Sequence, residues 1–278
     1  MSTSTTPLNG WRVGVTADRR ATQQVEVLRR RGAEVVTGCT MRTLDLSHDP
    51  RLLEASQALI DHPPNTTIIQ TGMGLTMWLE AMDAVGVGSE LRSSLAGAEI
   101  LTRGPKATSA ARKAGFEVEW SAPDEQLAQV VKYLASTGGR GRVALQIDGT
   151  DEETLVKPLA PLCKEVVIVP VYRWAWPLEV GPAEILIDAI CSGSVDAVTF
   201  TTRQAAVHLV EIADYRGRRD ELLAALDGVR VVPVSVGPVC SSAMTNLGMA
   251  GIVEPKRARM VAMVDALCAE ANRRSTRR

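Results

Sequence analysis

Short apolar, β-branched runs alternate along the chain with longer stretches of helical periodicity. We expect strands at Val13–Thr16, Glu34–Thr37, Thr67–Gln70 and Ile100–Thr102, and again at Val143–Ile147, Val166–Val169, Ala197–Thr201 and Val231–Val236. Each run is followed by a polar turn and a helical pattern, which is the arrangement that builds parallel sheets. The pattern therefore predicts an α/β fold with parallel sheets.

The same series of elements occurs twice. "RVGVTAD" from Arg12 matches "RVALQID" from Arg142 at an offset of 130, "AEVVTGCTMRT" from Ala33 matches "KEVVIVPVYRW" from Lys164 at 131, "TIIQTGMGLTMWL" from Thr67 matches "AVTFTTRQAAVHL" from Ala197 at 130, and "GPKATSAARKAG" from Gly104 matches "GPVCSSAMTNLG" from Gly237 at 133. Four matches in one order predict an internal duplication. They set Met41 opposite Tyr172 and Thr71 opposite Thr201.

The last of these pairs is a turn from a strand end into a helix. Gly104 and Gly237 allow a tight passage, and the prolines that follow favour the first helical turn. We expect the hydroxyl residues after each proline to cap exposed backbone N–H groups, and Gly115 and Gly248 to end the helices.

Ligands of open α/β sheets bind beyond the carboxyl ends of the strands, where helix N-termini favour anions. The candidate loops are Thr16–Arg20, Gln70–Gly74, Arg103–Thr108, "TTRQ" from Thr201 and "VGPVCSS" from Val236. Positive charge near a polyanionic ligand would come from Arg19, Arg20, Arg103, Lys106 and Arg203. The alternative for each is a solvated surface cation.

Composition narrows the class of protein. The 278 residues are 45% hydrophobic and 23% charged, which is ordinary for a globular protein and long enough for two domains. The 31 basic and 32 acidic residues nearly cancel, so no net field favours nucleic acid or an anionic membrane. Five scattered cysteines indicate reduced thiols in the cytoplasm, and the polar start "MSTSTTPLNG" predicts no export signal or membrane span.

The candidate chemistry is sparse. The histidines His48, His62 and His208 are isolated, so we expect no metal site and no nucleophilic triad. "TGMGLTMW" lacks the last glycine of a dinucleotide fingerprint, so no nicotinamide cofactor is expected. Tyr172, in "VPVYRW", is the one candidate phenol, and its alternative is a packing side chain with its hydroxyl in water.

The chain resembles the uroporphyrinogen-III synthase family through "RVGVTADRR", "LRRRGAEVV", "RGPKATSAARKAGFEV", "VPVYRW", "DAVTFTTRQAAVHLV" and "VSVGPVCSSAMTNLG". The resemblance implies two α/β domains joined by a two-stranded linker. Domain one would comprise residues 1–42 and 174–278, and domain two residues 43–173, with linker strands near Gly38–Leu44 and Val169–Trp174. Each domain would turn its own helix start toward a cleft.

The resemblance also implies a reaction. The linear tetrapyrrole hydroxymethylbilane would lose its hydroxyl as water, and the last pyrrole ring would invert through a spiro intermediate as the macrocycle closes, in haem or sirohaem biosynthesis. Tyr172 matches the family's linker tyrosine and would assist the departing hydroxyl, with no cofactor. We expect a cytoplasmic monomer that binds neither membrane nor, by this chain alone, nucleic acid. The expected substrate-binding residues are Thr16, Arg19, Arg20, Thr71, Gly72, Arg103, Gly104, Lys106, Thr108, Thr201, Thr202, Arg203, Gly237, Cys240 and Ser241.

Departures from the family pattern leave alternatives open. "QTG" stands where many members have "FTS", so Gly72 is expected to replace a hydroxyl residue, and Ala107 and Cys240 stand at threonine positions that Thr108, Ser241 or Ser242 could serve. One alternative is a non-catalytic ligand-sensing domain of an actinobacterial transcription regulator of nitrate or nitrite assimilation, although no DNA-binding element follows "MVAMVDALCAEANRRSTRR". Another is a periplasmic-binding-like receptor, which the missing export signal disfavours.

Overall fold

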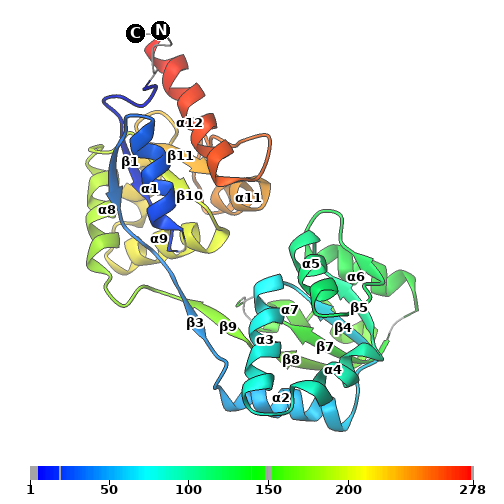
Figure 1. Ribbon diagram of the computed structural model, residues 1–278. Coiled ribbons are helices and arrows are strands. Elements are labelled where there is room, and N and C mark those ends of the chain that lie inside the picture. The colour runs from blue at the N-terminus through cyan, green and yellow to red at the C-terminus, as the bar shows by residue number, and fades with distance from the viewer. Residues whose placement is uncertain (1–5, 19, 139, 148, 150–151, 277–278) are drawn as a thin grey trace. The chain divides into compact units, whose positions relative to one another are not determined.

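The computed structural model describes residues 6–18, 20–138, 140–147, 149 and 152–276. It divides into two compact units, unit 1 with Met1–Arg42 and Ala175–Arg278, and unit 2 with Thr43–Trp174. Each unit is built on a parallel sheet packed with helices (Figure 1). The α/β fold with parallel sheets that the sequence predicts is confirmed.

Unit 1 contains a four-stranded sheet in the order β11-β10-β1-β2. Its strands are β1 (Arg12–Val15), β2 (Glu34–Thr37), β10 (Ala197–Phe200) and β11 (Val232–Ser235). Its helices are α1 (Ala21–Arg30), α8 (Gly181–Cys191), α9 (Arg203–Tyr215), α10 (Arg219–Ala225), α11 (Pro238–Asn246) and α12 (Met260–Ser275). Every residue of β10 and β11 is buried, as expected of parallel strands covered on both faces.

Unit 2 contains a five-stranded sheet in the order β6-β5-β4-β7-β8. Its strands are β4 (Thr66–Ile69), β5 (Glu99–Thr102), β6 (Trp120–Ser121), β7 (Arg140–Gln146) and β8 (Cys163–Val169). Its helical elements are α2 (Pro50–Asp61), α3 (Gly72–Ala84), α4 (Gly88–Ala96), α5 (Pro105–Lys113), α6 (Leu127–Ser136), α7 (Glu152–Val156) and the 3₁₀ helix Ala160–Leu162. Where the chain passes between the units, β3 (Arg42–Asp45) and β9 (Tyr172–Ala175) form a two-stranded sheet.

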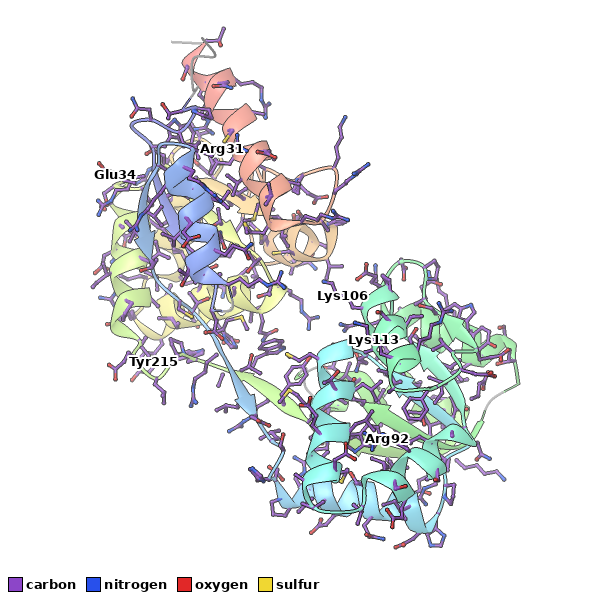
Figure 2. All side chains as sticks on the ribbon, in the orientation of Figure 1. Arg31, Glu34, Arg92, Lys106, Lys113 and Tyr215 are labelled. Carbon is purple, nitrogen blue, oxygen red and sulfur yellow. The ribbon has the colours of Figure 1, made fainter. Side chains whose placement is uncertain are left out.

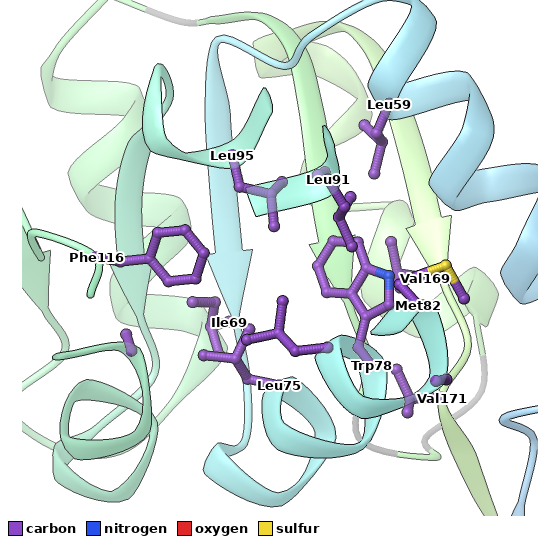
Figure 3. Packing of buried hydrophobic residues seen from close by; sticks show 14 of the residues in the cluster. Leu59, Ile69, Leu75, Trp78, Met82, Leu91, Leu95, Phe116, Val169 and Val171 are labelled. Atoms are coloured by element: carbon purple, nitrogen blue, oxygen red, sulfur yellow. The ribbon is translucent and has the colours of Figure 1, made fainter. Parts of the chain in front are cut away.

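The largest buried side chain of unit 2 is the indole of Trp78 on α3 (Figure 3). It packs among Met82, Leu91 and Val169, so it ties α3 and α4 to the sheet. Its N–H is satisfied, because it donates to Ser56 Oγ at 2.8 Å. This packing fixes α3, whose first residues follow the carboxyl end of β4.

The two sheets have the same strand order under the sequence matches. Strands β1, β2, β10 and β11 correspond to β7, β8, β4 and β5, and both sets are arranged in the same way, with β6 added at one edge of unit 2. A duplicated unit would give this order. The duplication itself stays a prediction.

One register of the sequence comparison is wrong by a residue. The N–H of Arg103 donates to Ile69 O at 3.0 Å, and the N–H of its counterpart Val236 donates to Phe200 O at 3.0 Å. Ile69 therefore corresponds to Phe200, and the structural counterpart of Thr71 is Thr202 rather than Thr201. The reason is that β4 and β10 each end one residue earlier than the apolar pattern predicts.

Candidate functional site

In each unit the parallel strands end at one edge of the sheet, and most of the predicted site residues lie in the turns that follow these strand ends. Unit 2 carries Thr71, Gly72, Arg103, Gly104, Lys106 and Thr108, together with Tyr172 at the start of β9. Unit 1 carries Thr16, Arg20, Thr201, Thr202, Arg203, Gly237, Cys240 and Ser241. The predicted residue Arg19 lies outside the described residues.

The phenol of Tyr172 is buried, with 1% of the residue exposed. Its ring packs in the unit 2 core and meets Trp174 edge to face, with ring centroids 5.2 Å apart. Its hydroxyl lies 3.2 Å from Thr71 Oγ1. The packing expected of this ring is present, but the hydroxyl is hydrogen-bonded to a side chain and not directed into water.

Thr71 links this phenol to the start of a helix. As the N-cap of α3, its Oγ1 accepts from Gly74 N at 3.0 Å, and its own N–H donates to Gln146 Oε1 at 3.0 Å. The partial positive charge at a helix N-terminus favours negative charge nearby. The position of the Tyr172 oxygen therefore suits a group that gives up a proton.

Gln146, which sequence reasoning missed, explains a glycine in this helix. An alanine Cβ at Gly74 would lie 2.1 Å from Gln146 Nε2, so the amide occupies the space of a side chain. At the corresponding positions unit 1 has Ala205 and the shorter Thr16. A polar residue ending a buried strand was the available signal for Gln146.

The start of α5 differs from the sequence-based expectation. Its N-cap is Gly104, without a side-chain cap, and Thr108 does not cap the helix. Instead the Thr108 hydroxyl lies 2.6 Å from Thr102 Oγ1 and donates to Ser121 Oγ at 3.1 Å and Gly104 O at 3.2 Å. The prediction that hydroxyls cap this helix is wrong, because the side chain turns back toward β5 and β6. Gly115, with φ +88°, does end the helix as expected.

Gly72 allows α3 and α5 to approach closely. A Cβ there would lie 2.5 Å from Lys106 O. The expected loss of a hydroxyl at Gly72 is wrong, because the hydroxyl-bearing cap is Thr71, which matches the cap Thr202 in unit 1. Lys106, in the first turn of α5, is exposed (Figure 2), and the guanidinium of Arg103 donates from Nη1 to Gln70 Oε1 at 3.2 Å.

Unit 1 repeats the capped helix start with other partners. Thr202 caps α9 by accepting from Ala205 N at 3.1 Å, and its Oγ1 lies 3.3 Å from Met41 Sδ. Thr201 is half-buried and Arg203 is exposed. Thr16 is fully buried, and its hydroxyl donates to Thr199 O at 2.9 Å. In this structure the Thr16 side chain therefore has a packing role and does not face a ligand.

The start of α11 is also mostly inward-facing. Gly237 N donates to Ser235 Oγ at 3.0 Å, and Cys240 is 3% exposed. Burial raises the pKa of the Cys240 thiol to about 11, so it stays protonated at neutral pH. The Ser241 oxygen is buried without a hydrogen-bond partner. Gly248, with φ +101°, ends the helix as expected.

Left-handed backbone occurs at both edges. Among the described residues, Arg20 with φ +58° and Glu125 with φ +59° are the non-glycine residues in this conformation. Arg20 precedes α1, and the Glu125 side chain lies against Gly104, where an added Cβ would be 2.8 Å from Glu125 Cγ. Such backbone is costly for side-chain-bearing residues and gathers at functional sites.

A basic loop that sequence reasoning missed lies beside the start of α11. Val253 bridges Val234 in parallel, so the residues after it leave at the carboxyl edge of the sheet. This loop contains the exposed cations Lys256, Arg257 and Arg259. It approaches the helix start, because a Cβ at Gly237 would lie 2.7 Å from Ala258 Cβ. A run of four residues with three cations was the available signal.

The comparisons with known proteins decide the family. The family model described as "Uroporphyrinogen-III synthase HemD" matches residues 22–265. The chain belongs to the uroporphyrinogen-III synthase family. A "putative uroporphyrinogen-III synthase" of Methanothermobacter thermautotrophicus is 31% identical over 165 residues, which is 59% of this chain and 63% of that relative's length. The uncharacterised protein YjjA of Bacillus subtilis is 24% identical over 262 residues, 92% of this chain and 94% of that protein.

Solved structures of the family share the fold. A mutant uroporphyrinogen III synthase of Thermus thermophilus superposes with a TM-score of 0.79 at 24% identity, covering 95% of this chain and 99% of that one. The Helicobacter pylori enzyme gives 0.53 at 11% identity, covering 94% and 99%. Within this synthase-family chain, no described group of three His, Cys, Asp or Glu residues is placed to hold a metal ion. None of the described helices has the length and apolar character needed to span a bilayer.

Proposed function

We propose that this chain is a uroporphyrinogen-III synthase. It would close hydroxymethylbilane into the macrocycle with inversion of the last pyrrole ring and loss of water, in the cytoplasm, as a monomer and without a cofactor. The family match over residues 22–265 supports the reaction class. The observation that carries the proposal is the Tyr172 hydroxyl, held 3.2 Å from the Thr71 cap at the start of α3.

The chemistry needs a proton at the leaving group. As the carbon–oxygen bond of the substrate breaks, the oxygen takes the Tyr172 proton and departs as water. The phenolate that remains is favoured by the N-terminus of α3 and recovers a proton when the ring closes. Because Tyr172 is 1% exposed, the side chains that cover it must shift when substrate binds, as catalytic contacts often tighten only in the complex.

The second task is positioning. Hydroxymethylbilane closes without inversion when left in water, so the protein must hold one geometry of the last ring. The substrate's carboxylates suit the N–H groups that begin α3 and α5 and the cations Arg103 and Lys106. Neither helix has an acidic residue in its first turn that would oppose an anion.

The test is a coupled assay. Freshly made hydroxymethylbilane is given to the purified chain, and the products are oxidised and resolved into the type I and type III isomers. Enrichment of type III supports the synthase. Only type I, from a protein that unfolds cooperatively on heating and is therefore folded, contradicts it.

A ligand-sensing domain is the second candidate, and one observation favours it. The Tyr172 hydroxyl is covered and bonded to Thr71, as it would remain in a protein that binds a tetrapyrrole without turning it over. In that case uroporphyrin III binds saturably, while the coupled assay yields type I at the rate seen without protein.

A further inference from the structure

The side chain of Gln70 has an unmet hydrogen-bond donor. Gln70 directly follows β4 and is 3% exposed. Its Oε1 accepts from Arg103 Nη1 at 3.2 Å, which fixes the orientation of the amide. Its Nε2 is buried and has no partner. Leaving such a donor buried and unpaired is costly, so its retention calls for a partner that the chain alone does not supply.

The surroundings of this amide favour an anion. Gln70 precedes the cap of α3, and its partner Arg103 precedes the cap of α5 (Figure 1). The two helix starts adjoin, because a Cβ at Gly72 would lie 2.5 Å from Lys106 O. The guanidinium and two helix N-termini therefore surround the amide with positive potential. Glu125, which contacts Gly104, is an opposing charge at this edge.

We propose that Gln70 and Arg103 form a seat for one carboxylate of the ligand. The Gln70 amide N–H donates to one carboxylate oxygen, and an N–H of the Arg103 guanidinium donates to the other. The inference rests on the proposed function in one respect, since it takes the ligand to be a carboxylate-rich tetrapyrrole. In unit 1 the corresponding residue is Thr201, whose side chain is too short to form the same pair.

Two variants of Gln70 separate binding from packing. Gln70→Met keeps the length of the side chain and removes the unmet donor. Gln70→Glu keeps an oxygen for Arg103 and puts a negative charge where the donor was. The matched control is Thr67→Val, because the Thr67 hydroxyl, in the same strand, is also buried without a partner.

The measurement is the dissociation constant of uroporphyrin III, an octacarboxylate, by quenching of tryptophan fluorescence in the full chain. We expect Gln70→Met to unfold at the same or a higher temperature than wild type and to bind about tenfold more weakly. Gln70→Glu should bind more weakly still, because two negative charges then meet. Thr67→Val should bind as wild type does.

Three outcomes overturn the seat. They are wild-type affinity in Gln70→Met, a loss of affinity in Thr67→Val equal to that in Gln70→Met, and no saturable binding of uroporphyrin III by the wild type. The seat and the proposed function can fail separately. If the wild type makes no type III isomer but Gln70→Met still weakens binding, the synthase fails and the seat stands. If the wild type makes type III and Gln70→Met binds normally, the seat fails alone.

Discussion

The two units place the same pair of positions in contact but give them different chemistry. In unit 2 the cap Thr71 meets the hydroxyl of Tyr172 at 3.2 Å, and in unit 1 the cap Thr202 meets the sulfur of Met41 at 3.3 Å. The backbone arrangement therefore does not require a phenol. A thioether fills the position in unit 1, so the phenol of unit 2 is available to be explained by chemistry.

The largest expected effect comes from erasing this difference. Tyr172→Phe keeps the ring packing and removes the proton donor, so we expect the rate of type III formation to fall about 100- to 10,000-fold, with little change in unfolding temperature. Met41→Leu is the control in unit 1 and should retain the rate within a few fold. Unchanged turnover in Tyr172→Phe would remove the tyrosine from the mechanism.

The next contrast is between Gln146 with Gly74 and their counterparts Thr16 with Ala205. Gly74→Ala should lower the free energy of unfolding by about 1–3 kcal/mol, because the new Cβ overlaps the Gln146 amide. Gln146→Thr in the same chain should recover most of that loss, since it reproduces the pair found in unit 1. Denaturant unfolding of the two single variants and the double variant measures the coupling. Additive losses would show that the two positions are independent.

A smaller effect distinguishes the hydroxyls of α5 and α11. Thr108→Val should cost about 1–2 kcal/mol, because it leaves Thr102 and Ser121 without a hydrogen-bonded partner. Its counterpart Ser241→Ala should change stability by less than about 0.5 kcal/mol or raise it, since the Ser241 oxygen is buried unpaired. Equal losses in urea unfolding would contradict the contrast.

The smallest effect concerns pH and unit 1. Burial lowers the pKa of His208, beside Glu211, Gln204 and Thr40, below its ordinary value of about 6.5. The folded form therefore keeps His208 neutral while the unfolded chain takes up a proton, so stability falls as pH decreases from about 6.5 to the folded-state pKa. His208→Gln should flatten this part of the stability curve. His62→Gln, at an exposed position, is the control, and an unaltered slope in His208→Gln would refute the assignment.

The strands were the most predictable part of the fold, for a physical reason. Strands covered on both faces are continuous apolar runs, and Glu34–Thr37 coincides with β2. Pairing also extends into polar sequence, so β7 begins at Arg140 and β8 at Cys163, three residues before the apolar runs. The linker strands begin later than expected, at Arg42 and Tyr172, and the two-residue strand β6 leaves no pattern to detect.

The site was predictable only as a set of loops. Helix starts after strands identify Thr71, Arg103 and Thr202 as edge residues, because topology alone brings strand ends together. The contact between Tyr172 and Thr71 joins residues 101 positions apart and depends on how β9 packs, which no local pattern encodes. The unmet donor of Gln70 is likewise a property of its surroundings, and a sequence does not show which hydrogen bonds are missing.

The division of the chain has a consequence for the order in which the protein is made. Unit 2 is one continuous segment, so its sheet can form as soon as that segment leaves the ribosome. Val13 in β1 instead pairs with Ala197 in β10, which is synthesised 184 residues later. At about 5–20 residues per second the first strand waits roughly 10–40 s for its partner. The first segment to emerge is thus among the last to fold, and over that interval chaperones can bind its apolar face.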